Sequence, residues 1–219
     1  MELTARLNDA KYAAFRWRHE LSIPKKLALA LVMVAVTALL AQLKFPLPWS
    51  PVPITGQTLG VLLAGVLLGQ WWGGISMGLY AVLGVVGLPL FAGWSHGLGI
   101  IAGPTGGYIV GFILASLFLG HFSDKYVRSR SFFVMLGLML FANFILIYIP
   151  GLVQLNRWLV LVKGQSVSLT QLLTMGLIPF LAGDITKAVT AAAIARGITP
   201  KRAFNGEVDK GKWANWRIP

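Results

Sequence analysis

The amino-acid sequence predicts an all-α membrane protein with six transmembrane helices. Hydrophobic residues make up 56% of the 219 residues, charged residues only 12%, and the mean hydropathy is +0.72. Soluble domains carry about 25% charged residues. Because one crossing needs about 20 residues, we expect about six spans and no second, soluble domain.

The apolar residues fall into six runs, which we expect to be the six spans. They cover residues 27–43, 59–70, 74–88, 105–122, 131–149 and 172–195. The first run is rich in alanine, which allows close helix packing. The tripeptide Trp71-Trp72-Gly73 joins the second and third runs, and its two tryptophans suit the membrane interface.

The runs divide the chain into a cytoplasmic amphipathic N-terminal segment (1–26), a six-helix transmembrane substrate-binding domain (27–196) and a basic cytoplasmic tail (197–219). In the first part, apolar residues recur at helical spacing at Leu3, Leu7, Ala10, Ala14, Trp17 and Leu21. This pattern predicts a helix lying on the membrane surface, although a solvated tail fits it equally well.

Three connections stand out by composition. Residues 45–57 contain four prolines, which exclude a continuous helix and predict an ordered, extended loop. Residues 88–103 are rich in glycine and too irregular to span, which predicts a re-entrant or capping loop. Residues 150–171 form an amphipathic connection between the fifth and sixth spans.

The distribution of basic residues predicts the orientation. Six spans place both termini on one side, and that side carries fifteen of the 19 lysine and arginine residues. By the positive-inside rule both termini are cytoplasmic, in a multi-pass protein of the cell membrane. The three connections then face outward. Orientation also accounts for the net charge of +12, because the basic residues form no patch with interleaved aromatics that would indicate nucleic-acid binding.

The most informative residues are Asp184 and Lys187, which lie inside the sixth apolar run. Their i, i+3 spacing places both side chains on one helical face. A charge inside the membrane costs about 3 kcal/mol or more, so such residues need a partner and usually have a function. A self-neutralised structural pair is one interpretation. The other is a polar ligand site that offers an acceptor beside a donor.

Two other motifs lack the neighbouring residues or structure that their usual function requires. Gly93-Trp94-Ser95-His96-Gly97 fits the G-x-S-x-G pattern of hydrolases, but no strand precedes it. Residues 206–212 have Walker A spacing but lack its final Ser or Thr. The chain has no cysteine and no run with metal-ligand spacing, so we expect no metal site and no catalytic residue.

We therefore expect a cavity where the charged pair, the glycine-rich segment and the exit of the proline loop converge. The candidate substrate-binding residues are Asp184, Lys187, Tyr108, Thr105, Gly97, Gly107, Asn143, Thr55, Gln57 and His96. Asn143 and Tyr148 are the polar points of the fifth span, and each also suits a helix contact.

Four stretches, in order, resemble the BioY-type biotin transporters, the substrate-binding (S) components of energy-coupling factor transporters. They are VPITGQTL (52–59), GLPLFAG (87–93), GPTGGY (103–108) with Gly111-Phe112, and Gly183-Asp184 with Lys187. The resemblance implies high-affinity biotin capture without catalysis or cofactor. It also implies a transmembrane coupling subunit and a pair of cytoplasmic ATPases as partners, and external loops that close over the ligand.

The resemblance further implies that Asp184 and Lys187, which match the family's G-D-x-x-K motif, belong to the biotin site. Asp184 would accept from the ureido N–H groups, and Lys187 would pair with either the ureido carbonyl or the carboxylate. Two features depart from the family: the first span has no A-x-x-x-A pattern, and Trp94-Ser95-His96 adds bulk to the glycine loop. Another vitamin-like substrate, or an intramembrane hydrolase using Ser95, are the alternatives.

Overall fold

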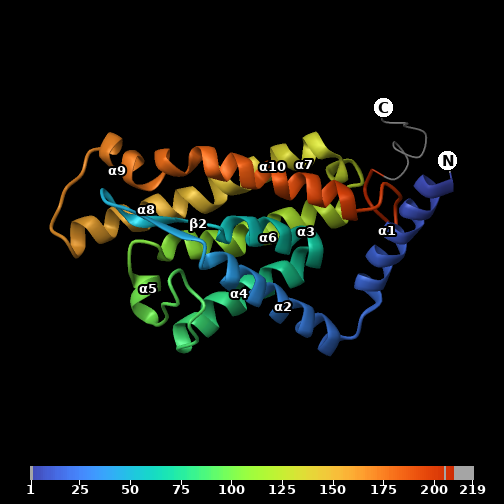
Figure 1. Ribbon diagram of the computed structural model, residues 1–219, viewed down its shortest axis with the longest axis horizontal. Coiled ribbons are helices and arrows are strands. Elements are labelled where there is room, and N and C mark those ends of the chain that lie inside the picture. The colour runs from blue at the N-terminus through green and yellow to red at the C-terminus, as the bar shows by residue number, and fades with distance from the viewer. Residues whose placement is uncertain (1, 205, 210–219) are drawn as a thin grey trace.

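The computed structural model describes residues 2–204 and 206–209, and it consists mainly of helices (Figure 1). The helices are α1 (Glu2–Glu20), α2 (Ile23–Ala41), α3 (Gln57–Leu68), α4 (Gln70–Val86), α5 (Leu98–Ala102), α6 (Gly106–Lys125), α7 (Phe132–Phe141), α8 (Tyr148–Leu161), α9 (Leu169–Gly176) and α10 (Leu181–Ile198). Short turns η1 (Arg128–Arg130), η2 (Ala142–Ile147) and η3 (Ile178–Phe180) lie between them. The fold is not purely helical, because strands β1 (Lys44–Leu47) and β2 (Ser50–Thr55) form a hairpin.

The spans differ in part from the prediction. Within the described part of the chain, four helical segments are long and apolar enough to cross a membrane, namely Ile23–Ala41, Gly106–Lys125, Phe132–Leu161 and Leu169–Ile198. Helices α3 and α4, with 12 and 17 residues, are apolar but shorter. The structure thus supports a membrane protein with several spans.

The junction between α3 and α4 lies at Gly69, and the predicted position at residues 71–73 is wrong. Gly69 has φ +83°, a left-handed conformation that suits glycine. The backbone N–H of Gln70, the first residue of α4, donates to the carboxylate of Asp124 at 3.0 Å. Trp71 and Trp72 instead lie in the first turn of α4.

The fifth span continues as a helix past Ile149, where it was predicted to end. Helix α7, the π-helical turn η2 and α8 form one segment from Phe132 to Leu161. Pro150 lies inside this segment, three residues after the end of η2. Much of the predicted connection 150–171 is therefore helix.

The last span is interrupted close to the charged pair. Helix α9 begins with a capping box, in which the side chains of Ser168 and Gln171 each accept a hydrogen bond from the backbone N–H of the other residue. The chain then passes through the 3-10 turn η3, which contains Pro179, before α10 starts at Leu181. The predicted single helix 172–195 is thus two helices, and Asp184 lies in the first turn of the second.

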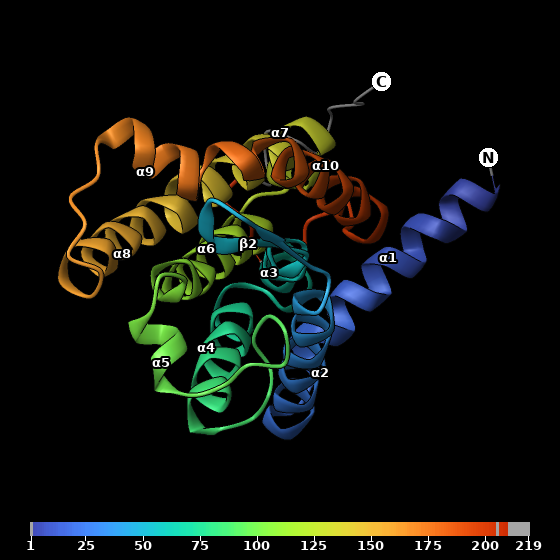
Figure 2. The same ribbon diagram turned by 60° about the vertical axis from the view of Figure 1, so that its left-hand side comes forward.

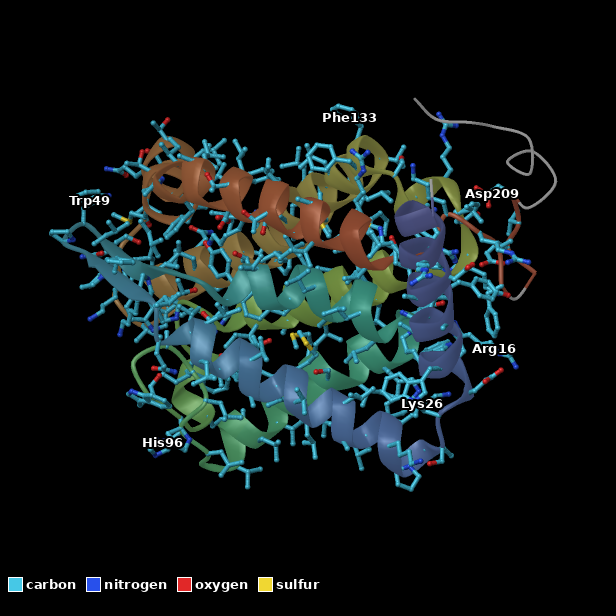
Figure 3. All side chains as sticks on the ribbon, turned by 45° about the vertical axis from the view of Figure 1, so that its right-hand side comes forward. Arg16, Lys26, Trp49, His96, Phe133 and Asp209 are labelled. Atoms are coloured by element: carbon cyan, nitrogen blue, oxygen red, sulfur yellow. The ribbon has the colours of Figure 1, made fainter. Side chains whose placement is uncertain are left out.

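The hairpin, the α5 segment and the α8–α9 connection lie at one end of the bundle, which we call the hairpin end (Figure 1). Figure 3 shows Trp49 and His96 at this end and Arg16, Lys26 and Asp209 at the opposite end. Prolines are tolerated in the proline-rich stretch because a two-stranded hairpin has only edge strands. The predicted grouping of the three connections on one side, opposite the termini, agrees with this arrangement.

Helix α1 leaves the bundle at an angle across the end opposite the hairpin (Figure 2). Its packed face carries Phe15, Arg18 and His19, and not the predicted apolar stripe, of which Leu7 and Trp17 are more than half exposed. Helix α1 is therefore docked, which argues against a free solvated tail. In the predicted basic tail, residues 205 and 210–219 lie outside the described residues.

A cluster of charged residues fastens the two ends of the described chain to the bundle. Arg18 donates to the carbonyl oxygens of Val66 and Leu67 and to the carboxylate of Asp124. Arg130 is buried and donates to Glu207 at 2.8 Å. The guanidinium carbons of Arg18 and Arg130 each lie 4.3 Å from the centre of the Phe15 ring.

Candidate ligand-binding site

A cavity of about 320 Å³ opens at the hairpin end, a size within the range of small-molecule sites. Its wall comes from the hairpin, the segment 91–100, α3, α6, the η2–α8 region and α10. The wall is mostly apolar, and its polar side chains are Lys44, Thr55, Gln57, Thr58, Ser95, Thr105, Tyr108, Tyr148, Asp184 and Lys187. Such a combination suits a small ligand with a few polar groups.

Asp184 is almost completely buried, with 2% of its surface exposed, and four side chains donate to its carboxylate. Oδ1 accepts from Lys187 and, at 3.2 Å, from the Thr58 hydroxyl. Oδ2 accepts from the Tyr148 hydroxyl and, at 3.0 Å, from Asn143 Nδ2. A carboxylate offers about four acceptor positions, so the protein itself satisfies Asp184.

Lys187 connects the charged pair to the hairpin. Its ammonium group contacts Asp184 and donates to the main-chain oxygen of Thr55 at 2.8 Å. An ammonium group has three N–H donors, so one is left for a further acceptor. Because the Lys187 side chain is 18% exposed and lines the cavity, a ligand oxygen in the cavity can reach that donor.

The π-helical turn η2 explains how Asn143 and Tyr148 reach the same carboxylate oxygen. Residues five apart in an α-helix point in widely different directions. A π turn pairs residue i with i+5, which brings such positions to nearly the same face. Asn143 lies within η2 and Tyr148 follows it directly. The local widening of the helix therefore builds the Asp184 site.

A chain of hydrogen bonds links the other polar residues of the wall. The Thr55 hydroxyl donates to Gln57 Oε1, Gln57 Nε2 donates to the Tyr80 hydroxyl, and Tyr80 donates to the Leu90 carbonyl oxygen. These contacts connect the hairpin, α3, α4 and the glycine-rich segment. Opposite them, the Tyr108 hydroxyl donates to the Gly176 carbonyl oxygen at 2.8 Å.

The glycine-rich segment, predicted to be a re-entrant or capping loop and called the capping loop below, contributes residues between Phe91 and Ile100 to the cavity wall. Phe91 is 1% exposed and packs edge-on against Tyr80, with ring centres 5.4 Å apart. The Phe91 N–H donates to the main-chain carbonyl oxygen of Ser95, and the Gly97 N–H donates to the main-chain carbonyl oxygen of Gly84. Gly84 contacts the Phe91 ring so closely that no side chain fits there. The segment is thus held onto α4 by an aromatic anchor.

The structure brings six of the ten candidate residues to the cavity wall. These are Thr55, Gln57, Thr105, Tyr108, Asp184 and Lys187.

The other four candidates lie elsewhere, each for a structural reason. Asn143 is behind Asp184 and holds its carboxylate. Gly107 faces Pro150 and permits the close packing of α6 on α8. Gly97 precedes α5 with φ +95°. His96 is exposed at the periphery of the hairpin end (Figure 3).

Several wall residues were missed by the sequence analysis. Thr58 lies within the stretch 52–59 that resembles the family but was not among the predicted site residues, and Lys44 lies just past the first predicted span. Phe91 and Phe112, which lie in stretches that resemble the family, and Phe180 supply apolar wall but were not among the predicted site residues. A lysine placed directly before the proline-rich segment was the one available signal for Lys44.

The environment of Ser95 does not resemble that of a hydrolase nucleophile. Its hydroxyl donates to the Ala92 carbonyl oxygen at 3.0 Å. His121 lies at the far end of α6, where its ring is 3.1 Å from Gln70 Oε1. Within the described residues, no hydrogen bond joins the Ser95 hydroxyl to a histidine, whereas nucleophilic catalysis by serine requires an adjacent base.

Comparisons with known proteins agree with the geometry. The model of the BioY family matches residues 11–204. A probable biotin transporter BioY of Methanothermobacter thermautotrophicus is 50% identical over 157 residues, which cover 72% of this chain and all of that protein. The biotin transporter BioY of Thermotoga maritima is 34% identical, over 68% of this chain and 82% of that one.

A solved structure is also similar. The crystal structure of the S-component for biotin from an ECF-type ABC transporter matches with a TM-score of 0.70 and 30% identity. The match covers 80% of this chain and 93% of that one. The cavity, its buried charged pair and these similarities lead to one conclusion: the chain belongs to the BioY family.

Proposed function

We propose that this protein captures biotin as the substrate-binding component of an energy-coupling factor transporter. The observation that carries the proposal is the Asp184–Lys187 pair in the wall of an otherwise apolar cavity. Biotin has a polar ureido ring, an apolar body and a carboxylate, which match such a cavity. The names of the similar proteins, biotin transporter and S-component for biotin, support the same substrate.

The hydrogen bonding of the pair determines how the ligand meets it. The remaining N–H of Lys187 suits a carbonyl oxygen of the ligand. Of the four side chains that donate to Asp184, Thr58 makes the longest contact, at 3.2 Å, so a ligand N–H would reach Oδ1 by displacing that hydroxyl. This refines the expectation from the sequence that Asp184 is open to both ureido N–H groups.

Equilibrium binding of radiolabelled biotin to the purified protein tests this function. Saturable, stoichiometric binding that Lys187→Met abolishes, in a variant that remains folded, is the expected result. A panel of unlabelled vitamins as competitors addresses the alternative substrate: another vitamin that displaces biotin at lower concentration would replace biotin in the assignment. A folded wild type without displaceable biotin binding would refute the proposal.

The family supports a role in transport, and we propose that the protein has no catalytic activity and needs no cofactor. It would act with a transmembrane coupling subunit and a pair of cytoplasmic ATPases. The chain has no complete nucleotide-binding motif, so ATP hydrolysis would come from partners. Uptake of biotin into proteoliposomes should require ATP and added coupling and ATPase subunits. If the protein alone accumulated biotin without ATP, the proposed need for partner subunits would be contradicted, but the proposed binding of biotin would not.

We also propose that the chain crosses the membrane six times with both termini cytoplasmic. The short helix α3 is compatible with a crossing because most of its residues are buried inside the bundle, where the polar backbone beyond its end is shielded from lipid. The exposed apolar stripe of α1 would contact lipid at the cytoplasmic surface.

Cysteine labelling tests the orientation, because the chain has no cysteine of its own. In intact cells, a membrane-impermeant maleimide should label Gln165→Cys, in the α8–α9 connection, and should label Arg128→Cys only after lysis. The opposite pattern would reverse the orientation.

A further inference from the structure

We propose that Lys44 binds the carboxylate of the ligand, so that the opposite, carbonyl-bearing end of the ligand lies against Lys187. This inference rests on the proposed function and names a specificity-determining residue for it. The inference rests on the ionised groups of the cavity wall. They are Lys44, Asp184 and Lys187, of which the last two form a pair with no net charge. The cavity therefore retains one uncompensated positive charge, which suits a monoanion.

The position of Lys44 directs it toward the cavity mouth. Lys44 begins β1 and pairs with Thr55, the residue whose carbonyl oxygen accepts from Lys187. The Lys44 side chain runs past Gly93 of the capping loop, where a Cβ atom would lie 3.0 Å from its ammonium nitrogen. Within the described residues, that ammonium group has neither an ion pair nor a hydrogen-bond acceptor.

Lys187 is a less favourable partner than Lys44 for the carboxylate of the ligand. Its ammonium group already neutralises Asp184, and two of its three donors are occupied. A ligand carboxylate at that position would lie beside the Asp184 carboxylate, and like charges repel each other strongly in a buried site. A neutral carbonyl oxygen experiences no such repulsion. Lys44 would thus bind the carboxylate of the ligand, and Lys187 would bind its carbonyl oxygen.

Apolar side chains supply much of the rest of the wall. They include Val52, Phe91, Ile100, Ile109, Phe112 and Ile147. An alkyl chain or a fused ring without ionised groups suits this surface. The complete site would therefore recognise a ligand that has a carbonyl group at one end, an apolar body and a carboxylate at the other end.

Gly93 is the neighbour past which the Lys44 side chain extends. Its φ of +73° lies in the left-handed region, where a side chain is strained. A Cβ atom there would also crowd the Lys44 ammonium group. The glycine thus leaves room for the lysine head at the edge of the cavity.

The test compares biotin with its neutral methyl ester and its neutral alcohol, biotinol. Lys44→Met should weaken the binding of biotin by roughly 10- to 100-fold, the loss expected for one charge-assisted hydrogen bond. It should leave the binding of the two neutral compounds unchanged, and Lys44→Arg should restore most of the biotin affinity. Lys187→Met should abolish the binding of all three ligands. Lys163→Met, another external-side lysine outside the cavity wall, is the matched control.

The outcomes separate this inference from the proposed function. If wild type binds biotin and Lys44→Met binds it equally well, Lys44 has no role and the inference is overturned. If Lys44→Met weakens acid, ester and alcohol to the same degree, the role is structural and the inference is also overturned. Failure of the wild type to bind biotin would refute the proposed function first.

Discussion

The ammonium group of Lys187 donates a 2.8 Å hydrogen bond to the main-chain oxygen of Thr55, 132 positions earlier in the chain. This bond ties the first turns of α10 to the end of β2, and Lys187 simultaneously contacts Asp184. One side chain therefore holds the hairpin over the cavity and neutralises the buried carboxylate. Loss of ligand binding in a Lys187 variant thus has two structural causes, which the first two predictions distinguish.

Lys187→Met should loosen the hairpin. The Thr55 carbonyl oxygen loses its charged donor, and leaving a partly buried acceptor unpaired costs about 1–3 kcal/mol. Hydrogen–deuterium exchange should become faster in residues 44–55, while α6 stays protected. Lys163→Met, in which the lost ammonium lies over Trp158, should leave exchange in the hairpin unchanged. Unchanged exchange in Lys187→Met would mean that this bond does not hold the hairpin.

Asp184→Asn should destabilise the protein by about 3 kcal/mol or more, because it leaves the Lys187 charge in a buried site without its partner. The double variant Asp184→Asn/Lys187→Met should recover part of this loss, since it contains no unpaired charge. Both variants should fail to bind biotin. Thermal unfolding in detergent measures the stability, and a double variant less stable than Asp184→Asn would contradict the coupling of the pair.

Gly107→Ala should be strongly destabilising. An added methyl group would overlap the Pro150 carbonyl oxygen and crowd Gln154 Cβ at 2.6 Å, so α6 and α8 must move apart. Overpacking of this kind costs about 1–3 kcal/mol. Gly137→Ala in α7 is the control, because nothing lies within 4 Å of its added methyl, and it should be neutral or stabilise the helix by up to about 1 kcal/mol. Equal unfolding temperatures for the two variants would refute the close contact.

The docking of α1 should weaken at acidic pH. Burial lowers the pKa of His19 below its ordinary value of 6.5, and nearby Arg18 and Arg130 lower it further, against the opposing effects of the Phe15 carbonyl and Asp124. A histidine with a lowered pKa in the folded state is kept neutral, whereas the unfolded chain binds a proton from about pH 6.5 downward. Stability is therefore lost as the pH falls from 6.5 to the lower, folded-state value.

Thermal unfolding between pH 7.5 and 5 measures this effect. His19→Gln, which cannot titrate, should show a smaller decrease over that interval than the wild type. An identical pH dependence of the two proteins would show that His19 does not contribute.

Part of the site could be predicted from the sequence, because it depends on the spacing of neighbouring residues and on the free-energy cost of placing a charged side chain in an apolar segment. Asp184 and Lys187 are three residues apart, so any helix brings them together, and the structure shows the contact. Thr55, Gln57, Thr105 and Tyr108, which were predicted as substrate-binding residues, also lie in the cavity wall, since they flank segments whose proline and glycine content indicated irregular backbone near the membrane.

Other features depend on contacts between distant segments and had no local signal. The π turn η2 changes which residues of the fifth span share a face, and this put Asn143 behind Asp184. The break before α10 and the packed face of α1 also depend on neighbouring helices. The role of Asp124 at the start of α4 depends on a contact 54 positions away.

The sequence by itself determined that this is a helical membrane protein with a buried charged pair, because hydropathy and helical spacing are properties of short segments. Only the tertiary structure decided which donors satisfy Asp184, how Lys187 reaches the hairpin and that Lys44 faces the same cavity. These relationships join residues more than a hundred positions apart in several cases. They arise when packing of the helices selects one set of partners for each buried polar group, and no short stretch of sequence contains that choice.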